Sequence, residues 1–378
     1  MKQSSSRVWR HLFSALSGTC LLAVVACSGN NSGPTLVDGG SSGNVATCDG
    51  TPALGKADFC KACTISPTAV PNTCKAPRTI NACCTFVQPP SQELARGTGL
   101  VRSSSKDPVL QLGCLDDPGV VGASKAFTLK GFVRVFSSGS DSAGVKIEIF
   151  KEGLNGALGD LVGVPVSTTK DGKALDPALA SYLKKCPDGG CTYREFTYTG
   201  VPSETPLIVK TSDAAGGEQW AALYDYNVFF PSSTVGAGDV IEGYQPAAVA
   251  ATDINTVASA AGGFTVRQDK GLLAGEVHDC GDVRVAGATV DTDVAHEGDM
   301  FYFGENEADP LPDKSRGPLG TSKLGLFGTL NLPTGQPIRV SAVGKSGGHT
   351  ILLGTYTVQT FPGAVTALSF RGRRPWQK

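Results

Sequence analysis

One sequence pattern occurs twice in this chain, and it constrains the fold more than any other feature. The segment Phe196–Val209 aligns without a gap on Phe327–Val340, and the two copies share a phenylalanine, two prolines and a valine. An internal repeat of this kind is typical of a duplicated structural unit, so we expect two similarly folded domains in tandem. Two shorter elements precede each copy in the same order: Leu129–Val133 and Ala143–Ile147 before the first, Leu273–Val277 and Ala286–Val290 before the second.

Short runs of β-branched and aromatic residues dominate the chain from residue 123 onward, and glycine, proline and aspartate separate them. In the clearest run, Val145, Ile147 and Ile149 alternate with Lys146 and Glu148, which is typical of a half-buried strand. Glycine supplies 48 of the 378 residues and favours turns over long helices. We therefore predict a mainly β fold of two tandem β-sandwiches. Further strand-like runs are 207–209, 223–230, 351–358 and 365–370.

Only two segments have helical patterns. Asp253 is placed to cap a short helix that carries Ile254 and Ala258 on one side and ends at Gly262–Gly263. The segment 176–185 has the composition of a further turn or two of helix, limited by a proline near its start.

The N-terminus has the pattern of a secretory signal. Lys2, Arg7 and Arg10 form a positively charged region, and an apolar stretch at 12–25 follows it. This stretch is too short and too polar for a convincing membrane-spanning helix. We therefore expect export to a compartment in which cysteines are oxidised to disulfides.

The end of this signal, Leu22–Cys27, resembles the lipobox of bacterial lipoproteins, in which the cysteine thiol is acylated and the cysteine becomes the mature N-terminus. The resemblance implies lipidation of Cys27 and attachment to the membrane through more than one acyl chain, which anchors a protein stably. Ser28 follows, which in Gram-negative lipoproteins is typical of export to the cell outer membrane, on its periplasmic or surface-facing side. The alternatives are plain secretion and an uncleaved anchor.

Cysteines are dense in the region after the signal. A stretch rich in serine, glycine and asparagine comes first and predicts a flexible tether. The cysteine-rich segment behind it is too short to build a large core, so we expect structural disulfides. Cys60 and Cys63 form a CxxC pair that could instead serve zinc binding or redox chemistry, but no second pair at zinc spacing accompanies it. Six cysteines allow fifteen pairings, and the sequence does not choose among them. They are Cys48, Cys60, Cys63, Cys74, Cys83 and Cys84.

Four further cysteines lie in the β-rich part. Cys186 and Cys191 enclose a four-residue turn and are candidates for a local disulfide across a hairpin tip. Cys114 precedes the first repeat and Cys280 lies in the second, and if both are paired they would be partners by elimination. Such a bond would fix the two sandwiches against each other, provided that the two Cα atoms come within about 7 Å.

The second repeat resembles the carboxypeptidase regulatory-like domain. The residues that carry the resemblance are Gly275–Val277, Ala286–Val290, Gly325–Phe327 and Leu332–Pro333 leading into Ile338–Val340. The resemblance implies a transthyretin-like, prealbumin-type β-sandwich, and the first repeat is similar to it with a longer insert. These motifs mark turns and close strand contacts, so they carry fold and no chemistry. In isolation such a domain is similar to adhesion, scaffolding or carbohydrate-binding modules, and no peptidase domain accompanies it in this sequence.

Together these patterns predict a sequence of segments, each with its own composition. They are a lipoprotein signal peptide at 1–26, a tether at 27–47, a disulfide module at 48–90, a linker at 91–122, the first sandwich at 123–232, a connector with a short helix at 233–268 and the second sandwich at 269–374.

Motifs for catalysis are weak in this sequence. His278, His296 and His349 are too scattered for a histidine-rich metal site, and Gly139–Gly144 lacks the spacing of a nucleophile elbow. No glycine-rich loop carries the lysine of a nucleotide-binding site. The acidic loop 291–309 could bind calcium, but it lacks the twelve-residue loop pattern and a solvated acidic turn is the alternative. We therefore expect no catalysis, no cofactor and no metal.

The overall charge speaks against nucleic acid as a partner, because 33 basic residues face 34 acidic ones. We predict a non-catalytic, lipid-anchored cell-envelope protein with a structural, adhesive or binding role, whose partners are the membrane and a polysaccharide or envelope protein. One alternative is carbohydrate binding, for which Trp220, Tyr224 and Tyr226 are the ring-stacking candidates, with core packing as their other role. A second is an accessory protein of a hydrolase or transport system. A third feature to consider is an intramolecular Lys–Asn isopeptide, as in related adhesin sandwiches.

Overall fold

The computed structural model describes residues 87, 90–92, 94, 99–136, 141–175, 192–217, 219–307, 309–346 and 349–377. These residues form mainly β-strands, which confirms the predicted fold class. Within the described ranges, none of the helices has the length and apolar character needed to cross a bilayer. The short elements outside the main sheets are α3 (Gly113–Asp116) and the 3-10 turns η2 (Leu154–Gly156), η5 (Ser232–Thr234) and η6 (Lys314–Arg316).

The first half of the β-rich region, residues 126–244, is built from two facing layers. A three-stranded layer in the order β10-β2-β6 covers a four-stranded layer in the order β5-β4-β7-β9. Between them lies a core that includes Leu129, Ile147, Ile149, Tyr198 and Val209, all fully buried. The strands are β2 (Ala126–Phe132), β4 (Val145–Glu152), β5 (Leu158–Ser167), β6 (Glu195–Pro202), β7 (Leu207–Asp213), β9 (Leu223–Val228) and β10 (Val240–Tyr244).

The second half, residues 271–371, is also built from two facing layers. A three-stranded layer in the order β14-β17-β18 faces a four-stranded layer in the order β15-β16-β12-β19. Leu273, Phe327, Val340 and Leu368 belong to the core between them. The strands are β12 (Gly271–His278), β14 (Ala288–Thr292), β15 (Glu297–Tyr302), β16 (Leu326–Leu332), β17 (Pro337–Ser346), β18 (His349–Gln359) and β19 (Val365–Arg371).

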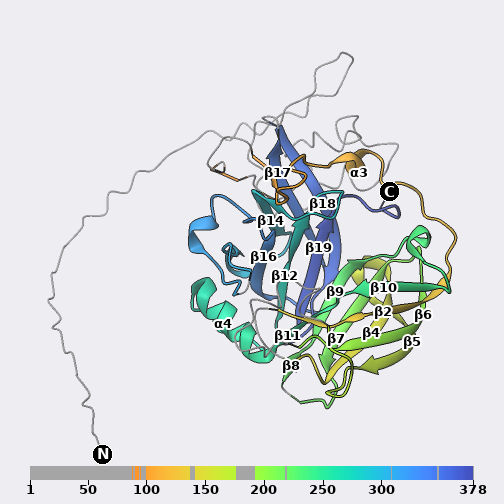
Figure 1. The fold of residues 1–378 in the computed structure, drawn as a ribbon. Coiled ribbons are helices and arrows are strands. Elements are labelled where there is room, and N and C mark those ends of the chain that lie inside the picture. Colours follow the sequence, from red (N-terminus) through yellow and green to blue (C-terminus); the bar gives the residue numbers. More distant parts are fainter. Residues whose placement is uncertain are drawn as a thin grey trace, which may run out of the picture. The chain divides into compact units, whose positions relative to one another are not determined.

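The two halves are joined by backbone pairing. β19 pairs in parallel with β9, with Val365 opposite Leu223 and Leu368 opposite Tyr226, and this merges the two four-stranded layers into one eight-stranded sheet (Figure 1). Successive side chains of a strand point to opposite faces. On β7, Val209 accordingly lies in the core of the first half, while its neighbour Ile208 lies in the core of the second. The two covering layers therefore pack on opposite faces of the shared sheet.

The connecting segments form a third layer over the middle of this sheet. β3 (Arg134–Val135), β11 (Ala247–Ala250) and β8 (Trp220–Ala221) make a small sheet, and α4 (Ala251–Gly262) continues directly from β11. The helix ends, as predicted, at a glycine: Gly263 adopts the left-handed conformation. The predicted cap was wrong, because Asp253 lies in the first turn of α4 and Ala250 occupies the N-cap position.

The strand pairing repeats between the halves in the same way as the sequence. β2 pairs antiparallel with β6 and parallel with β10, and β12 pairs antiparallel with β16 and parallel with β19. Gly131 lies opposite Phe196 in the first half, and the residues aligned with them, Gly275 and Phe327, lie opposite each other in the second. The sequence repeat thus corresponds to equivalent strands in equivalent registers.

A threonine outside the aligned motifs fixes the same turn in both halves. Thr168 Oγ1 accepts a hydrogen bond from the Val145 amide (3.0 Å) and donates one to the Ser142 carbonyl. In the same way, Thr321 Oγ1 accepts a hydrogen bond from the Ala288 amide (3.0 Å) and donates one to the Val285 carbonyl. Val145 and Ala288 begin equivalent strands, so the correspondence extends to side-chain contacts that sequence comparison did not detect.

The segment before the first half contacts the second half. β1 (Val101–Arg102) pairs with β13 (Val285–Ala286), and Cys114 forms a disulfide with Cys280 across a Cα–Cα distance of 5.6 Å. This confirms the pairing expected for these two cysteines. Part of the predicted linker at 91–122 is therefore an element of the second half, which it reaches before the first half begins.

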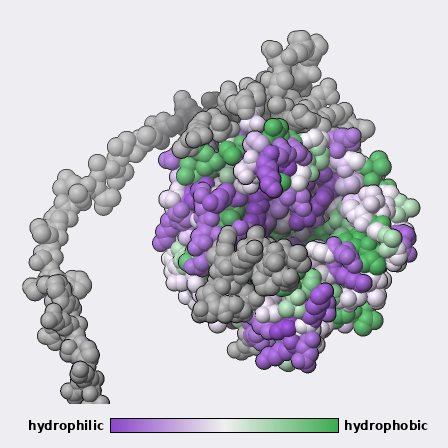
Figure 2. All heavy atoms as spheres, viewed as in Figure 1, coloured by the Kyte–Doolittle hydropathy of each residue, from purple (hydrophilic) through white to green (hydrophobic). Residues whose placement is uncertain are grey.

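The open surface mixes polar and apolar residues. On the face shown in Figure 2, hydrophilic residues gather near the centre, and hydrophobic residues lie toward the right-hand edge. The large apolar side chains that are exposed include Val109, Val120, Leu154 and Val164. Scattered exposed apolar residues are ordinary in folded proteins. The recesses of the molecule therefore say more about a ligand site than its open surface does.

The two aligned glycines predict matched effects of substitution. A Cβ on Gly131 would lie 1.7 Å from the Tyr244 carbonyl oxygen, and a Cβ on Gly275 would lie 1.9 Å from that of Leu368. We expect Gly131→Ala and Gly275→Ala each to lower the free energy of unfolding by about 2–4 kcal/mol, because neither neighbouring strand can move aside without losing its pairing. Chemical denaturation measures this loss, and Gly113→Ala, which meets no atom within 4 Å, is the control.

The disulfide predicts a second stability effect. Cys114 and Cys280 are 166 residues apart in sequence, so their bond restricts a long loop of the unfolded chain. We expect the free energy of unfolding of the Cys114→Ser, Cys280→Ser double variant to be about 2–5 kcal/mol lower than that of the natural protein. Denaturant titration of both proteins under oxidising conditions tests this, and equal midpoints would contradict it.

Candidate functional site

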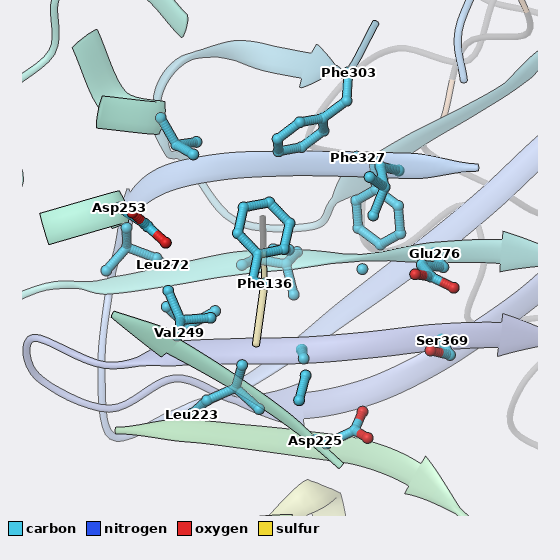
Figure 3. Close-up of a pocket in the computed structure, with 18 of the residues that line it drawn as sticks. Phe136, Leu223, Asp225, Val249, Asp253, Leu272, Glu276, Phe303, Phe327 and Ser369 are labelled. Carbon is cyan, nitrogen blue, oxygen red and sulfur yellow. The ribbon is translucent and has the colours of Figure 1, made fainter. Parts of the chain in front are cut away.

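A cavity of about 180 Å³ lies between the eight-stranded sheet and the layer of connecting segments (Figure 3). Its floor comes from β9, β19, β12 and β16, and its cover comes from β11, α4 and the chain around β3. Most of its wall is apolar, and the figure shows this apolar part between Asp253 at one end and Asp225 and Glu276 at the other. The apolar wall includes Phe136, Leu223, Val249, Ile254, Leu272 and Phe303. We call this space the seam cavity.

The polarity of the seam cavity follows from three neighbouring strands that run in parallel, β12, β19 and β9. On β12, alternation places Leu272, Ala274 and Glu276 on the cavity face, whereas Leu273 and Val277 face the core of the second half. The cavity face of this strand therefore changes from apolar to charged toward its C-terminal end.

The two strands beside it change in the same direction. On β19 the cavity lining runs from Val365 and Ala367 to Ser369 and Arg371, and on β9 Leu223 is followed by Asp225. Because the three strands are parallel and in register, their polar residues meet at one end of the seam cavity. The apolar residues meet at the other end.

Glu276 is the centre of an ion-pair cluster at the polar end. Its carboxylate lies 2.7 Å from His278 Nε2, 3.0 Å from the Arg284 guanidinium and 3.7 Å from that of Arg134. Burial alone would raise the pKa of Glu276, but the hydrogen bond with His278 and the charges of the two arginines hold that pKa well below its usual range. Glu276 is therefore ionised and fully compensated.

Asp225 is different, because its carboxyl group has neither a hydrogen bond nor an ion pair with any residue that the structure describes. Burial raises the pKa of Asp225 to about 7, and the charge of Glu276 adds to the rise, while Arg371 and Arg134 oppose it. The hydroxyl of Tyr244, which also lines the seam cavity, is buried without a hydrogen-bond partner. Burial and the charge of Asp225 raise the pKa of Tyr244 well above its usual value.

A second recess of about 530 Å³, the charged cleft, adjoins the seam cavity at its polar end. The two share Arg134, Gln245, Glu276 and Arg371 as lining residues. The charges of the cleft are paired as well: Asp282 lies 2.8 Å from His278 and 3.0 Å from Arg371, and Glu307 lies 2.8 Å from Arg284. Burial would lower the pKa of His278, but its hydrogen bonds with Asp282 and Glu276 raise it.

The aromatic candidates for sugar stacking lie mainly in the interior. Trp220 is 3% exposed and donates its indole N–H to the Ala143 carbonyl (3.1 Å), and Tyr226 is 1% exposed and donates its hydroxyl to the Gly156 carbonyl (2.7 Å). Tyr224 stacks on Phe361 with ring centroids 3.9 Å apart. These contacts give each ring a packing role, and they provide no support for a sugar-binding platform.

The acidic loop does not gather its carboxylates. Asp291 pairs with His296 (3.1 Å), whereas Asp293 pairs with Arg339 (2.9 Å). The two carboxylates therefore have separate partners. In the described part of the chain, no group of three or more histidine, cysteine, aspartate or glutamate side chains could hold a metal ion. His278 belongs to the charged cleft, and His349 is the first residue of β18.

Several predicted features lie outside the described residues. They are the lipidation site Cys27 and the disulfide candidates Cys48, Cys60, Cys63, Cys74, Cys83, Cys84, Cys186 and Cys191, together with the helical pattern at 176–185.

Comparisons with known proteins leave the family open. No family model matches the sequence, and no curated protein matches it. Among solved structures, a chain described as a marsupial T cell receptor aligns with 9% identity over 64% of this chain and 98% of that chain, with a TM-score of 0.11. A score this low carries no argument about fold or function.

The raised pKa of Asp225 predicts a pH dependence of stability. Between its ordinary value of 3.8 and about 7, the folded protein holds the Asp225 proton more tightly than the unfolded chain does. Ionisation of this carboxyl therefore destabilises the fold as the pH rises. We expect the free energy of unfolding to fall between about pH 4 and pH 7 and to level off above this range, and Asp225→Asn to remove on the order of 1–3 kcal/mol of that fall.

Denaturant titrations across this pH range measure the slope. Asp160→Asn, on the exposed part of β5, is the control and keeps the slope of the natural protein. A variant at Asp225 with the full natural slope would show that this carboxyl does not titrate near neutral pH in the folded state.

Proposed function

We propose that this protein is a non-catalytic, lipid-anchored binding protein of the cell envelope, and that the seam cavity is its ligand site. The observation that carries the proposal is the form of the cavity. It has an apolar wall, and most of its charged groups converge at one end, while Asp253 lies at the other. Ligand sites in proteins commonly have this form, because the apolar wall supplies affinity and the few polar groups fix orientation.

The state of the charged groups favours binding over catalysis. At the polar end, Glu276 and His278 are both held in ion pairs, and each of these pairs joins two charged side chains. Arg134, Arg284 and Arg371 each have an acidic neighbour too. A rigid network of this kind suits a site that holds its shape while a ligand enters.

The size of the seam cavity limits what it can accept. An engineered apolar cavity of about 150 Å³ is large enough to bind benzene. The seam cavity, at about 180 Å³, is of similar size, so we propose a ligand with an apolar part no larger than one aromatic ring or a short alkyl chain.

Small apolar probes test this site. We expect benzene and ethylbenzene to bind in the seam cavity and to shift the NMR signals of Leu223, Val249 and Leu272. Ala274→Leu should abolish these shifts by filling the cavity from its floor. Leu161→Met, on the exposed face of β5, is the control that retains binding. Unchanged spectra of the natural protein with both probes would contradict a ligand site here.

Lipid attachment rests on the sequence, in which Leu22–Cys27 resembles a lipobox. We expect cells that express the full chain to incorporate labelled palmitate into the protein, and Cys27→Ser to remove the label and release the protein from the membrane fraction. Cys20→Ser, within the signal, is the matched control and keeps the label. Label that persists in the Cys27 variant would contradict lipidation at this residue.

We also propose that the two halves descend from one transthyretin-like sandwich, as the resemblance of the second repeat implies. Support comes from the equivalent pairing of β2 and β12 with their neighbours, and from the equivalent contacts of Thr168 and Thr321.

A further inference from the structure

We propose that the polar end of the seam cavity recognises a hydroxyl group, so that the ligand is a small uncharged alcohol or phenol whose apolar part fills the cavity. This inference deepens the proposed function and rests on it. It begins with two polar groups that the fold leaves without partners and that line the same end of the cavity: the buried hydroxyl of Tyr244 and the half-buried carboxyl of Asp225.

Buried polar groups in native proteins nearly always have hydrogen-bond partners, and an exception calls for an explanation. In most of this interior the rule holds: the Tyr226, Tyr302 and Tyr198 hydroxyls all have backbone partners. The Tyr244 hydroxyl has none, although its oxygen is buried. The carboxyl of Asp225 likewise makes no hydrogen bond or ion pair with its arginine neighbours, whose charges act on it from a distance. Both groups can therefore bond to a molecule that enters the seam cavity.

The hydrogen-bonding capacities of the two side chains are complementary to a hydroxyl. An ionised carboxylate only accepts, whereas a phenol can donate. A ligand hydroxyl placed between them donates to Asp225 and accepts from Tyr244. A hydrocarbon ligand would leave both groups without a hydrogen-bond partner. A site built to hydrogen-bond a hydroxyl discriminates strongly against a ligand that lacks one.

The charges at this end disfavour charged ligands. The charged side chains that face the polar end are Arg134, Arg371, Glu276 and Asp225, so their formal charges sum to zero when Asp225 is ionised. Tyr244 is neutral because burial raises its pKa. A carboxylate ligand would meet Asp225 and Glu276, and an ammonium ligand would meet the two arginines. A neutral group that both donates and accepts meets neither penalty.

A series of ligands of equal size tests the proposal on the full chain. Benzyl alcohol, ethylbenzene, benzylamine and benzoate share one ring, and titration calorimetry gives a dissociation constant for each. We expect benzyl alcohol to bind, and Tyr244→Phe and Asp225→Leu each to weaken its binding by about five- to fifty-fold. The same variants should leave ethylbenzene within about twofold of its natural affinity or bind it more tightly.

Tyr224→Phe is the matched control, because Tyr224 lies one residue from Asp225 on β9 and points to the opposite face of the sheet. It should keep the affinity for benzyl alcohol. Tyr244→Phe removes one oxygen that has no partner, so it should fold as the natural protein does, and thermal unfolding without ligand verifies this.

The outcomes separate this inference from the proposed function. Binding of ethylbenzene together with benzyl alcohol affinity that neither variant changes would overturn hydroxyl recognition and keep the seam cavity as a ligand site. Preferred binding of benzylamine or benzoate would also overturn it, in favour of a charged ligand. Binding of none of the four compounds would overturn the proposed site itself.

Discussion

The parallel pairing of β19 with β9 is the contact on which the rest of this structure depends. Two sandwiches connected only by a linker would each bury their own core and leave the outer faces of their sheets to solvent. Here the pairing makes their sheets continuous, with the covering layers on opposite faces. The cavity-facing side of β12 and β19 is therefore left to the connecting segments, β3, β11 and α4. These short elements cover the strands incompletely, and the seam cavity is the space that remains.

The same pairing explains why charged residues gather at this place. The C-terminal ends of β9, β19 and β12 meet there, and each carries a charged residue on the cavity face: Asp225, Arg371 and Glu276. A buried charge is tolerated when oppositely charged partners surround it. The loss of one partner leaves the remaining charges uncompensated, which destabilises the fold. The cluster around Glu276 thus ties residues of both halves together, because Arg134 comes from the first half and Arg284 from the second.

Much of the fold follows from local sequence, but the site does not. The strands and the glycine at the end of α4 could be predicted, because residue alternation and the conformational freedom of glycine can be read within one segment. The Cys114–Cys280 pair could be predicted because few cysteines remained to be paired. The seam cavity depends on the order of strands across the two halves, which no single segment contains. The change from an apolar to an acidic residue on β9 (Leu223, Asp225) and on β12 (Leu272, Glu276) indicates the cavity only once these strands are known to flank β19. The indole of Trp220 was ambiguous for the same reason: its face of the sheet became known only with the pairing of β8 and β11.

The bond between Cys114 and Cys280 has a consequence for the architecture as a whole. The cysteines stand on either side of the entire first half in the sequence, so residues 114–280 form a covalently closed ring that contains that half. A single backbone cut anywhere within the ring opens it without separating the pieces, because the sulfur bridge still joins them. The first half can thus lose the integrity of its chain, at an exposed turn such as the one at η2, while both fragments stay in one molecule.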